Sequence, residues 1–257
     1  MGPVGRRCVG ARWLAPTYRV IGRRDDAVQV MNVERCASGD LVPTAAMWLE
    51  ARLRSLTDGG RRCSIAVSGG RTPWEVFALF AQGALPWELI DVFQVDERVA
   101  PAGSDERNLT RLDQVWFSRV PVGRHPMPVE SPGVSAPDLG APDLDTAAAA
   151  YSVELPGVFD LIHLGLGPDG HCASLVPGDP VLDVTDRDVA VTGAYQGRRR
   201  MTLTYPVLNR AAEIVWIVSG DDKSDALAQL LAADPAIPAG RVDPAHATVL
   251  TDLPEGP

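Results

Sequence analysis

Short runs of apolar residues alternate along the chain with longer segments in which apolar positions recur at helical spacing. The short runs predict strands at Cys63–Val67, Ile90–Val95, Phe159–Leu164, Met201–Thr204, Ile214–Ser219 and Thr248–Leu250. The longer segments predict helices at Pro43–Leu56, Pro73–Gln82, Asn108–Ser118, Thr146–Leu155 and Asp222–Ala233. This alternation is typical of the α/β class, and it predicts one Rossmann-like domain in which helices flank a mostly parallel sheet.

Two segments carry neither pattern. Residues 1–24 hold six arginines before the first acidic residue, Asp25, and their apolar residues are scattered among glycine and proline. We interpret them as a flexible basic leader, with a transit peptide as the alternative, ahead of a domain at residues 25–257. The stretch Pro121–Asp145 is rich in proline, glycine and serine, which predicts a long surface connection.

The charge balance limits the classes of partner. The 257 residues carry 33 acids against 24 bases, and without the six leader arginines the balance is 18 bases against 33 acids, or −15. So acidic a body disfavours nucleic acid and anionic membrane as partners, and it predicts that any anion is bound by a few local cations. One of these is Lys223, the only lysine beside 23 arginines.

Cysteine spacing and hydropathy exclude further classes. The four cysteines form no Cys-x-x-Cys pair, which disfavours a disulfide framework or a structural zinc site and favours the cytoplasm. Because no apolar run approaches 18 residues, we expect no membrane span.

Candidate chemistry gathers in loops that follow predicted strands. Ser68, Asp96 and Gly165 each come directly after one of these strands, and Gly220 follows a fourth. In an open parallel sheet the carboxyl ends of the strands share one edge, where ligands bind. We therefore expect four loops that are distant in sequence to meet at one site.

The first loop, Ser68–Pro73, is suited to binding an anion. Its two glycines allow a close backbone approach, its serine and threonine supply hydroxyls, and Arg71 adds positive charge. The alternative is an ordinary strand-to-helix turn in which Thr72 is the N-cap. A glycine-rich turn alone does not decide between the two.

The second loop contains Asp96–Arg98 and, after a polar stretch, Asn108. One interpretation is a solvated cluster of salt bridges. The other is that a carboxylate holds Arg98 where it neutralises charge on a substrate oxygen.

The third loop, Gly165–His171, is the most specific segment of the chain. Its three glycines and one proline constrain the backbone, and Asp169 stands two residues before His171. Histidine is the usual general base near neutral pH, and a nearby carboxylate fixes its tautomer. The alternative is a capping aspartate beside a packed histidine. The adjacent Cys172 is interpreted as a small buried filler.

Two further cations belong to the same edge. Arg200 ends a run of three arginines, a pattern typical of a solvated face. Lys223 lies near the start of a predicted helix, where the helix dipole is unfavourable to a cation, so its position indicates another role, such as contact with a phosphate.

Taken together, these segments resemble the 6-phosphogluconolactonase family, which is related in fold to the glucosamine-6-phosphate deaminases. The resemblance rests on Ser68–Pro73, Asp96–Arg98, Asn108, Gly165–Gly178, Arg200–Pro206 and Gly220–Lys223. The deaminases usually have tyrosine in the place of Arg98 and a glutamate shortly after the histidine. This chain has neither, so the resemblance favours the lactonases.

The resemblance implies hydrolysis of 6-phospho-D-glucono-1,5-lactone to 6-phospho-D-gluconate in the oxidative pentose phosphate pathway, with no metal or other cofactor. It implies that His171 activates water, that Asp169 orients it, that Arg98 stabilises the oxyanion and that Asp96 supports the site. The substrate-binding set that it implies is Ser68, Gly69, Gly70, Arg71, Thr72, Asn108, Gly167, Gly170, Arg200 and Lys223. We expect a cytoplasmic monomer or homodimer whose partner is the phosphosugar lactone.

Three positions depart from the family pattern. Arg71 and Arg107 stand where the family usually has serine, and Cys172 replaces a usual threonine. The two arginines are predicted to add positive charge near the phosphate site, where they could alter substrate choice.

Three other functions stay open at this stage. The first is another sugar-phosphate hydrolase or isomerase of the same fold. The second is a serine α/β-hydrolase, because Ala66–Gly70 approximates a nucleophile elbow and His246 could complete a triad. The third is a sugar-phosphate sensor without catalysis.

Overall fold

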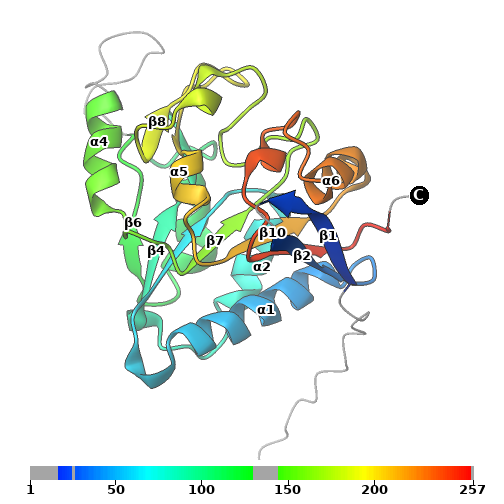
Figure 1. Cartoon of the computed structure of the whole chain (residues 1–257). Helices are drawn as coiled ribbons and strands as arrows, with labels where there is room; N and C mark the ends of the chain where they lie inside the picture. Colours follow the sequence, from blue (N-terminus) through cyan, green and yellow to red (C-terminus); the bar gives the residue numbers. More distant parts are fainter. Residues whose placement is uncertain (1–16, 25–26, 130–143, 256–257) are drawn as a thin grey trace, which may run out of the picture.

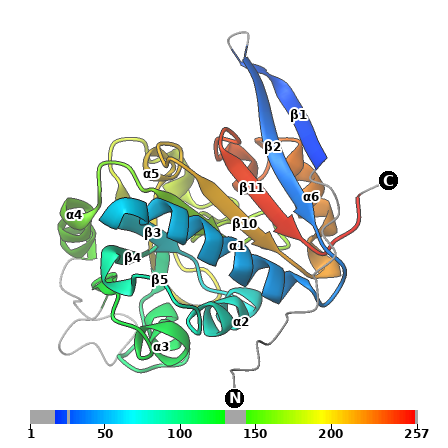
Figure 2. The same ribbon diagram turned by 90° about the horizontal axis from the view of Figure 1, so that it is seen from below.

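The structure, a computed structural model, describes residues 17–24, 27–129 and 144–255. Its main sheet has eight strands in the order β1–β2–β11–β10–β7–β3–β4–β6 (Figures 1 and 2). Strand β1 pairs antiparallel with β2, and the other neighbouring pairs are parallel. The strands are β1 (Thr17–Arg24), β2 (Ala27–Arg35), β3 (Cys63–Val67), β4 (Ile90–Gln94), β6 (Gly123–His125), β7 (Leu161–Leu164), β10 (Ile214–Val218) and β11 (Ala247–Thr251). The predicted α/β class with a mostly parallel sheet is confirmed.

Helices cover both faces of this sheet. Figure 1 shows α1 below the sheet, with α5 and α6 above it. The helices on the α1 side are α1 (Leu41–Leu56), α2 (Arg71–Phe80) and α3 (Asn108–Leu112), which a wider turn continues over Asp113–Phe117. Those on the other side are α4 (Leu144–Glu154), α5 (Tyr205–Leu208) and α6 (Ser224–Leu231). Short 3₁₀ turns occur at Asp58–Gly60, Trp87–Leu89, Pro180–Asp183, Asp221–Lys223 and Ala239–Arg241.

A second, antiparallel sheet of three strands was not predicted. Its order is β5 (Asp96–Arg98), β9 (Arg200–Leu203) and β8 (Val189–Val191). Strand β5 begins two residues after β4 ends, so this sheet starts at the carboxyl edge of the main one. The strand expected at Met201–Thr204 therefore belongs to the small sheet.

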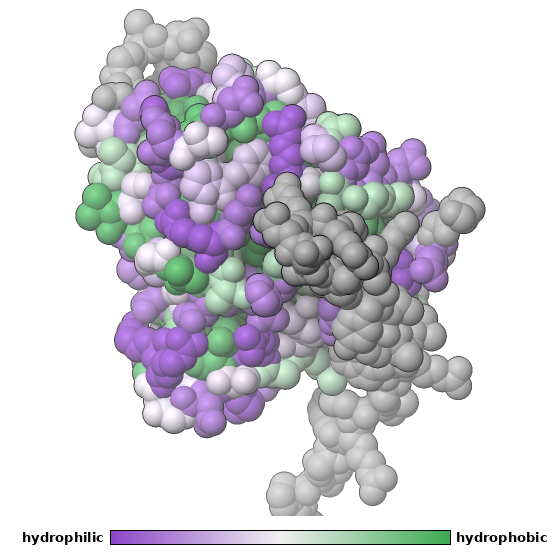
Figure 3. All heavy atoms as spheres, in the orientation of Figure 1, coloured by the Kyte–Doolittle hydropathy of each residue, from purple (hydrophilic) through white to green (hydrophobic). Residues whose placement is uncertain are grey.

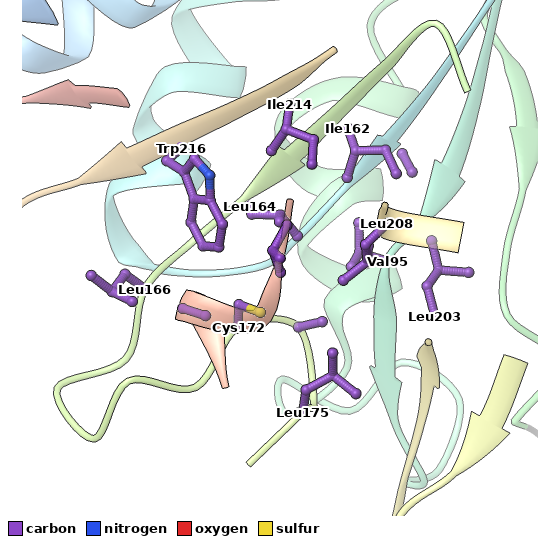
Figure 4. Packing of buried hydrophobic residues seen from close by; sticks show 14 of the residues in the cluster. Val95, Ile162, Leu164, Leu166, Cys172, Leu175, Leu203, Leu208, Ile214 and Trp216 are labelled. Atoms are coloured by element: carbon purple, nitrogen blue, oxygen red, sulfur yellow. The ribbon is translucent and has the colours of Figure 1, made fainter. Parts of the chain in front are cut away.

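Alternation along the buried strands produces two separate cores. In β10, Val215 and Ile217 pack with α1 and α2, whereas Ile214 and Trp216 face the other side. Successive side chains of a strand point to opposite faces, so fully buried strands read as continuous apolar runs. Figure 4 shows Cys172 in the core on the side of the sheet covered by α4, α5 and α6, where its thiol is fully buried. Its interpretation as a buried filler is confirmed, and burial raises the pKa of the thiol.

The N-terminal region differs from its prediction. Residues Thr17–Arg24 were assigned to the flexible leader, but they form β1 and pair with β2, which lies beside β11 (Figure 2). In β2, Met31 and Val33 are buried while Asn32 and Glu34 are half-buried, the alternation of a strand with one packed face. Residues 1–16 lie outside the described part, so only for them does the flexible leader stay a prediction.

The connection predicted over Pro121–Asp145 also contains a strand. Strand β6 pairs in parallel with β4 and forms an edge of the main sheet, and residues 130–143 lie outside the described part. No described helix is long and apolar enough to span a membrane. On the face seen in Figure 3, hydrophobic residues are scattered among hydrophilic ones.

Candidate active site

A cavity of about 360 Å³ lies beside the carboxyl ends of β3, β7 and β10 and the start of β5. The four predicted loops do meet there. Of the candidate residues, those that line the cavity are Ser68, Gly69, Gly70, Arg71, Thr72, Asp96, Arg98, Asn108, Gly167, His171, Arg200 and Lys223. Asp169 and Gly170 are not among its lining residues. A larger, open depression of about 610 Å³ lies along α1 and contains none of the candidates.

His171 lines the cavity and is paired with Asp169, which does not line it. Asp169 Oδ1 lies 2.5 Å from His171 Nδ1 and also accepts the His171 backbone N–H. Burial acts to raise the pKa of Asp169, but the hydrogen bonds and charge of His171 outweigh it, so the pKa is lowered. The carboxylate is therefore ionised at neutral pH. Because Nδ1 is engaged, Nε2 is the ring nitrogen left for a substrate or water.

Gly167 leaves the space that this pair occupies. A Cβ atom on Gly167 would lie 2.1 Å from His171 Nδ1 and 2.7 Å from Asp169 Oδ1. Its neighbour Gly170 has φ +78°, a backbone conformation that favours glycine, and packs against Ile237.

We expect Gly167→Ala to displace His171 and to lower kcat by about tenfold to a hundredfold, because small misplacements of a reacting group are costly. The control is Gly157→Ala, since a Cβ there meets nothing within 4 Å. Steady-state kinetics and a thermal melt of both variants would check this. A Gly167→Ala enzyme with wild-type kcat would contradict the steric argument.

The loop between β3 and α2 presents unused polar groups to the cavity. Gly70, with φ 146°, is the N-cap of α2, so the alternative with Thr72 as N-cap is wrong. The Ser68 backbone N–H donates to the carbonyl and to Nδ1 of His163. The Ser68 hydroxyl is buried and finds no hydrogen-bond partner among the described residues. It is thus free to bind a ligand oxygen.

Gly69 allows Asn108 to pack against this loop. A Cβ on Gly69 would lie 2.2 Å from Asn108 Oδ1. Asn108 Nδ2 donates to the backbone oxygen of Asp96 at 2.9 Å, whereas Oδ1 has no hydrogen-bond partner among the described residues. The amide oxygen of Asn108 is thus a second polar atom available at the cavity.

Asp96 and Glu97 are buried and Arg98 is half-buried, so the interpretation as a solvated salt-bridge cluster is wrong. Asp96 is 4% exposed, and its Oδ2 accepts the Ser174 hydroxyl at 2.6 Å. Arg98 Nη1 donates to the Glu106 carbonyl at 2.9 Å, so a backbone oxygen, not the carboxylate we expected, holds the guanidinium. Arg98 Nε is buried without a hydrogen-bond partner among the described residues.

Glu97 is a supporting residue that the sequence analysis missed. Its side chain is fully buried and accepts the backbone N–H groups of Arg98, Asn108 and Leu109 at 2.8 Å each. It also accepts Gln94 Nε2 at 2.9 Å. The carboxylate therefore caps α3 and ties it to β5, which fixes the backbone of two cavity residues.

Arg200 lines the cavity and packs against Tyr195. Arg200 is 5% exposed, and burial lowers its pKa. Its guanidinium lies 4.9 Å above the ring of Tyr195, and Nη2 donates to Gln196 Oε1 at 3.3 Å. Arg200 Nε is buried and has no hydrogen-bond partner among the described residues. The sequence analysis missed Tyr195, because nothing in its spacing points to the site.

The sequence of the chain is similar to those of known proteins. Residues 37–251 match the family model described as glucosamine-6-phosphate isomerases/6-phosphogluconolactonase. The chain belongs to this family. It is 36% identical over 202 residues to a 6-phosphogluconolactonase of Synechocystis sp., covering 76% of this chain and 83% of that one. It is also 39% identical over 168 residues to a 6-phosphogluconolactonase of Mycobacterium tuberculosis, covering 60% and 67%.

The fold agrees with a solved member of the family. The crystal structure of 6-phosphogluconolactonase from Thermotoga maritima superposes with a TM-score of 0.74 at 27% identity, covering 85% of this chain and 97% of that one. The predicted resemblance and the predicted relation in fold are confirmed.

The departures from the family pattern have different outcomes. Arg71 lines the cavity, as predicted. Arg107 does not: it is 1% exposed, lies 3.2 Å from the Glu97 carboxylate and donates to the Ala100 carbonyl. The prediction that Arg107 adds charge at the phosphate site is therefore wrong, because the buried carboxylate of Glu97 draws the guanidinium into the protein.

The serine-hydrolase alternative is contradicted by the sheet. Ser68 follows the carboxyl end of β3, whereas His246 immediately precedes β11 and is exposed. Strands β3 and β11 run in the same direction, so the two residues lie at opposite edges of the sheet. No group of three or more His, Cys, Asp or Glu side chains in the described part is placed to hold a metal ion. The absence of a cofactor stays a prediction.

Proposed function

We propose that the protein is a 6-phosphogluconolactonase, which hydrolyses 6-phospho-D-glucono-1,5-lactone to 6-phospho-D-gluconate in the oxidative pentose phosphate pathway of the cytoplasm. The observation that carries the proposal is that His171, paired with Asp169, lines a cavity that is also lined by Arg98, Arg200 and Lys223. A general base and several cations thus line the same cavity. Hydrolysis of a phosphorylated ester needs the base to activate water and the cations to bind the phosphate.

The proposed chemistry follows from the tautomer that Asp169 selects. With its Nδ1 proton donated to the carboxylate, His171 has a lone pair on Nε2 that removes a proton from water. The hydroxide oxygen bonds to the lactone carbonyl carbon, and Arg98 stabilises the resulting oxyanion. When the tetrahedral intermediate collapses, the bond to the ring oxygen breaks and His171 returns the proton to that oxygen. The imidazolium that forms in between is stabilised by Asp169.

The phosphate would be held at the other end of the cavity. Ser68 offers a hydroxyl there, the start of α2 offers backbone N–H groups, and Arg71, Arg200 and Lys223 offer positive charge. These cations are local, as the acidic body of the chain requires.

We expect Lys223→Ala to weaken binding of 6-phosphogluconate by about tenfold to a hundredfold, as for the loss of one charge-assisted hydrogen bond of about 1.5–3 kcal/mol. Burial lowers the pKa of Lys223, the charge of Arg71 adds to this, and Asp222 opposes it. The ammonium therefore loses its proton at a lower pH than an ordinary lysine. The affinity of the wild type should fall as the pH rises through the lowered pKa of Lys223. Lys223→Arg should not show this fall, because the guanidinium stays charged.

Isothermal titration calorimetry across alkaline pH would measure both effects. The control is Arg187→Ala, because Arg187 is a surface cation paired with Asp186 and does not line the cavity. Unchanged affinity in Lys223→Ala would place the phosphate elsewhere.

The proposed function itself is tested by the rate of lactone opening with and without the protein, since the lactone also opens spontaneously. We expect acceleration well above that background, with 6-phosphogluconate as the product by NMR. Glucosamine 6-phosphate should release no ammonia. A rate equal to the background, or deamination of the amino sugar, would contradict the proposal.

A further inference from the structure

Tyr195 contacts both functional parts of the site, although it is not among the residues that line the cavity. Its hydroxyl donates to Asp169 Oδ2 at 3.1 Å. Its ring meets the His171 imidazole edge-on, with 5.6 Å between centroids. The guanidinium of Arg200 lies over its ring, 4.9 Å from the centroid.

We propose that Tyr195 is a positioning residue with two separable actions: its hydroxyl holds the carboxylate that orients the general base, and its ring holds the arginine that binds phosphate. The inference rests on the proposed function. It adds that a single side chain, Tyr195, connects Asp169 of the catalytic pair to Arg200, which binds the phosphate.

The hydroxyl fixes the second oxygen of the Asp169 carboxylate. Oδ1 is engaged with His171, and Oδ2 accepts the tyrosine hydroxyl. With both oxygens bonded, the carboxylate cannot rotate away from the imidazole. Burial, followed by the charge of Asp169, raises the pKa of Tyr195, so the hydroxyl keeps its proton at neutral pH and stays a donor.

The ring of Tyr195 stabilises a buried cation, the guanidinium of Arg200. Arg200 is 5% exposed, and its polar contacts through Nη1 and Nη2, to Ser174 and Gln196, are 3.4 and 3.3 Å long. An aromatic face stabilises a desolvated guanidinium and limits its orientations. Removing the ring would therefore loosen Arg200 even where Asp169 is unaffected.

The hairpin that carries Tyr195 is itself held in place. Tyr195 and Arg198 pair across a two-residue turn in which Gln196 and Gly197 have φ 52° and 79°, the positive values that tight hairpin turns require. Arg198 pairs with Glu106 at 2.6 Å, and the carbonyl of Glu106 holds Arg98. The ion pair between Arg198 and Glu106 therefore helps to hold the turn that carries Tyr195 in place.

Tyr195→Phe removes the hydroxyl and keeps the ring, whereas Tyr195→Leu removes both. We expect Tyr195→Phe to lower kcat by about tenfold with KM within about twofold, because only the orientation of the base is disturbed. Tyr195→Leu should lower kcat similarly and also raise KM by about threefold to tenfold, through Arg200. Arg199→Ala, an exposed residue of the same segment, is the control with wild-type constants.

A weaker hydrogen bond at His171 Nδ1 distinguishes positioning from loss of structure. The ionisable groups facing the imidazole are Asp169 from its own loop and Tyr195 from the hairpin, with Arg200 behind the tyrosine and Asp96 and Arg98 on the same cavity. Without the hydroxyl, the Asp169 carboxylate is free to rotate, so its hydrogen bond with His171 Nδ1 weakens. The NMR signal of the Nδ1 proton should therefore move upfield in Tyr195→Phe.

The Nδ1 proton signal is measurable in the free protein, with no turnover. A wild type no faster than the background would overturn the proposed function, while the NMR comparison would still decide the action of the hydroxyl. Unchanged kcat and an unchanged Nδ1 proton signal in Tyr195→Phe would overturn the first action. Equal KM values in Tyr195→Phe and Tyr195→Leu would overturn the second.

Discussion

Replacing His171 with asparagine is expected to lower kcat by about two to four orders of magnitude, the usual contribution of a general base. Asparagine keeps a donor for the Asp169 carboxylate but has no nitrogen lone pair that accepts a proton from water. The substrate-binding cations lie elsewhere on the cavity, so KM should change far less than kcat. Initial rates corrected for spontaneous opening of the lactone would measure both constants.

His246→Asn is the matched control. His246 is exposed at the amino end of β11 and has φ 61°, a conformation that asparagine tolerates well. The variant should keep wild-type kcat, because residue 246 lies at the edge of the sheet opposite to that of Ser68. If His246→Asn lost activity while His171→Asn retained it, the assignment of the base would be wrong.

The elements that could be predicted are those whose packing produces a recognisable pattern of apolar residues in the local sequence. Strands β3, β7 and β10 are buried on both faces and therefore read as apolar runs. Strand β2 was missed because only one face packs, so that Met31 and Val33 alternate with more exposed neighbours. The small sheet was missed because β5 and β8 have three residues each, too few for a period to be recognised.

The site shows a similar division. Glycines, the histidine and the strand ends located the cavity, because the parallel topology itself brings those ends together. The sequence could not distinguish the directions of neighbouring side chains. Asp96 lines the cavity while Glu97 turns to the start of α3, and Asn108 lines it while Arg107 turns to Glu97. These directions depend on contacts between segments about ten residues apart and on the small sheet.

The second large effect concerns stability. Glu97→Ala is expected to lower the free energy of unfolding by about 3–5 kcal/mol, as for removal of one member of a buried ion pair. The change removes the Glu97 carboxylate from beside the buried Arg107 guanidinium, and it removes the acceptor of three backbone N–H groups. Urea denaturation would measure the loss. Because Asn108 and Arg98 are tethered to Glu97, kcat/KM should fall as well.

Two comparisons separate the buried network from an ordinary ion pair. Arg107→Met should cost less than Glu97→Ala, because the Glu97 carboxylate would keep its four N–H donors, whereas Glu97→Ala removes the acceptor of all four. Glu106→Ala, which breaks the surface pair with Arg198, should cost only about 0–1 kcal/mol. Equal losses in Glu97→Ala and Glu106→Ala would mean that the buried carboxylate adds no more stability than a surface pair, and that α3 is held mainly by its apolar contacts around Leu112 and Trp116.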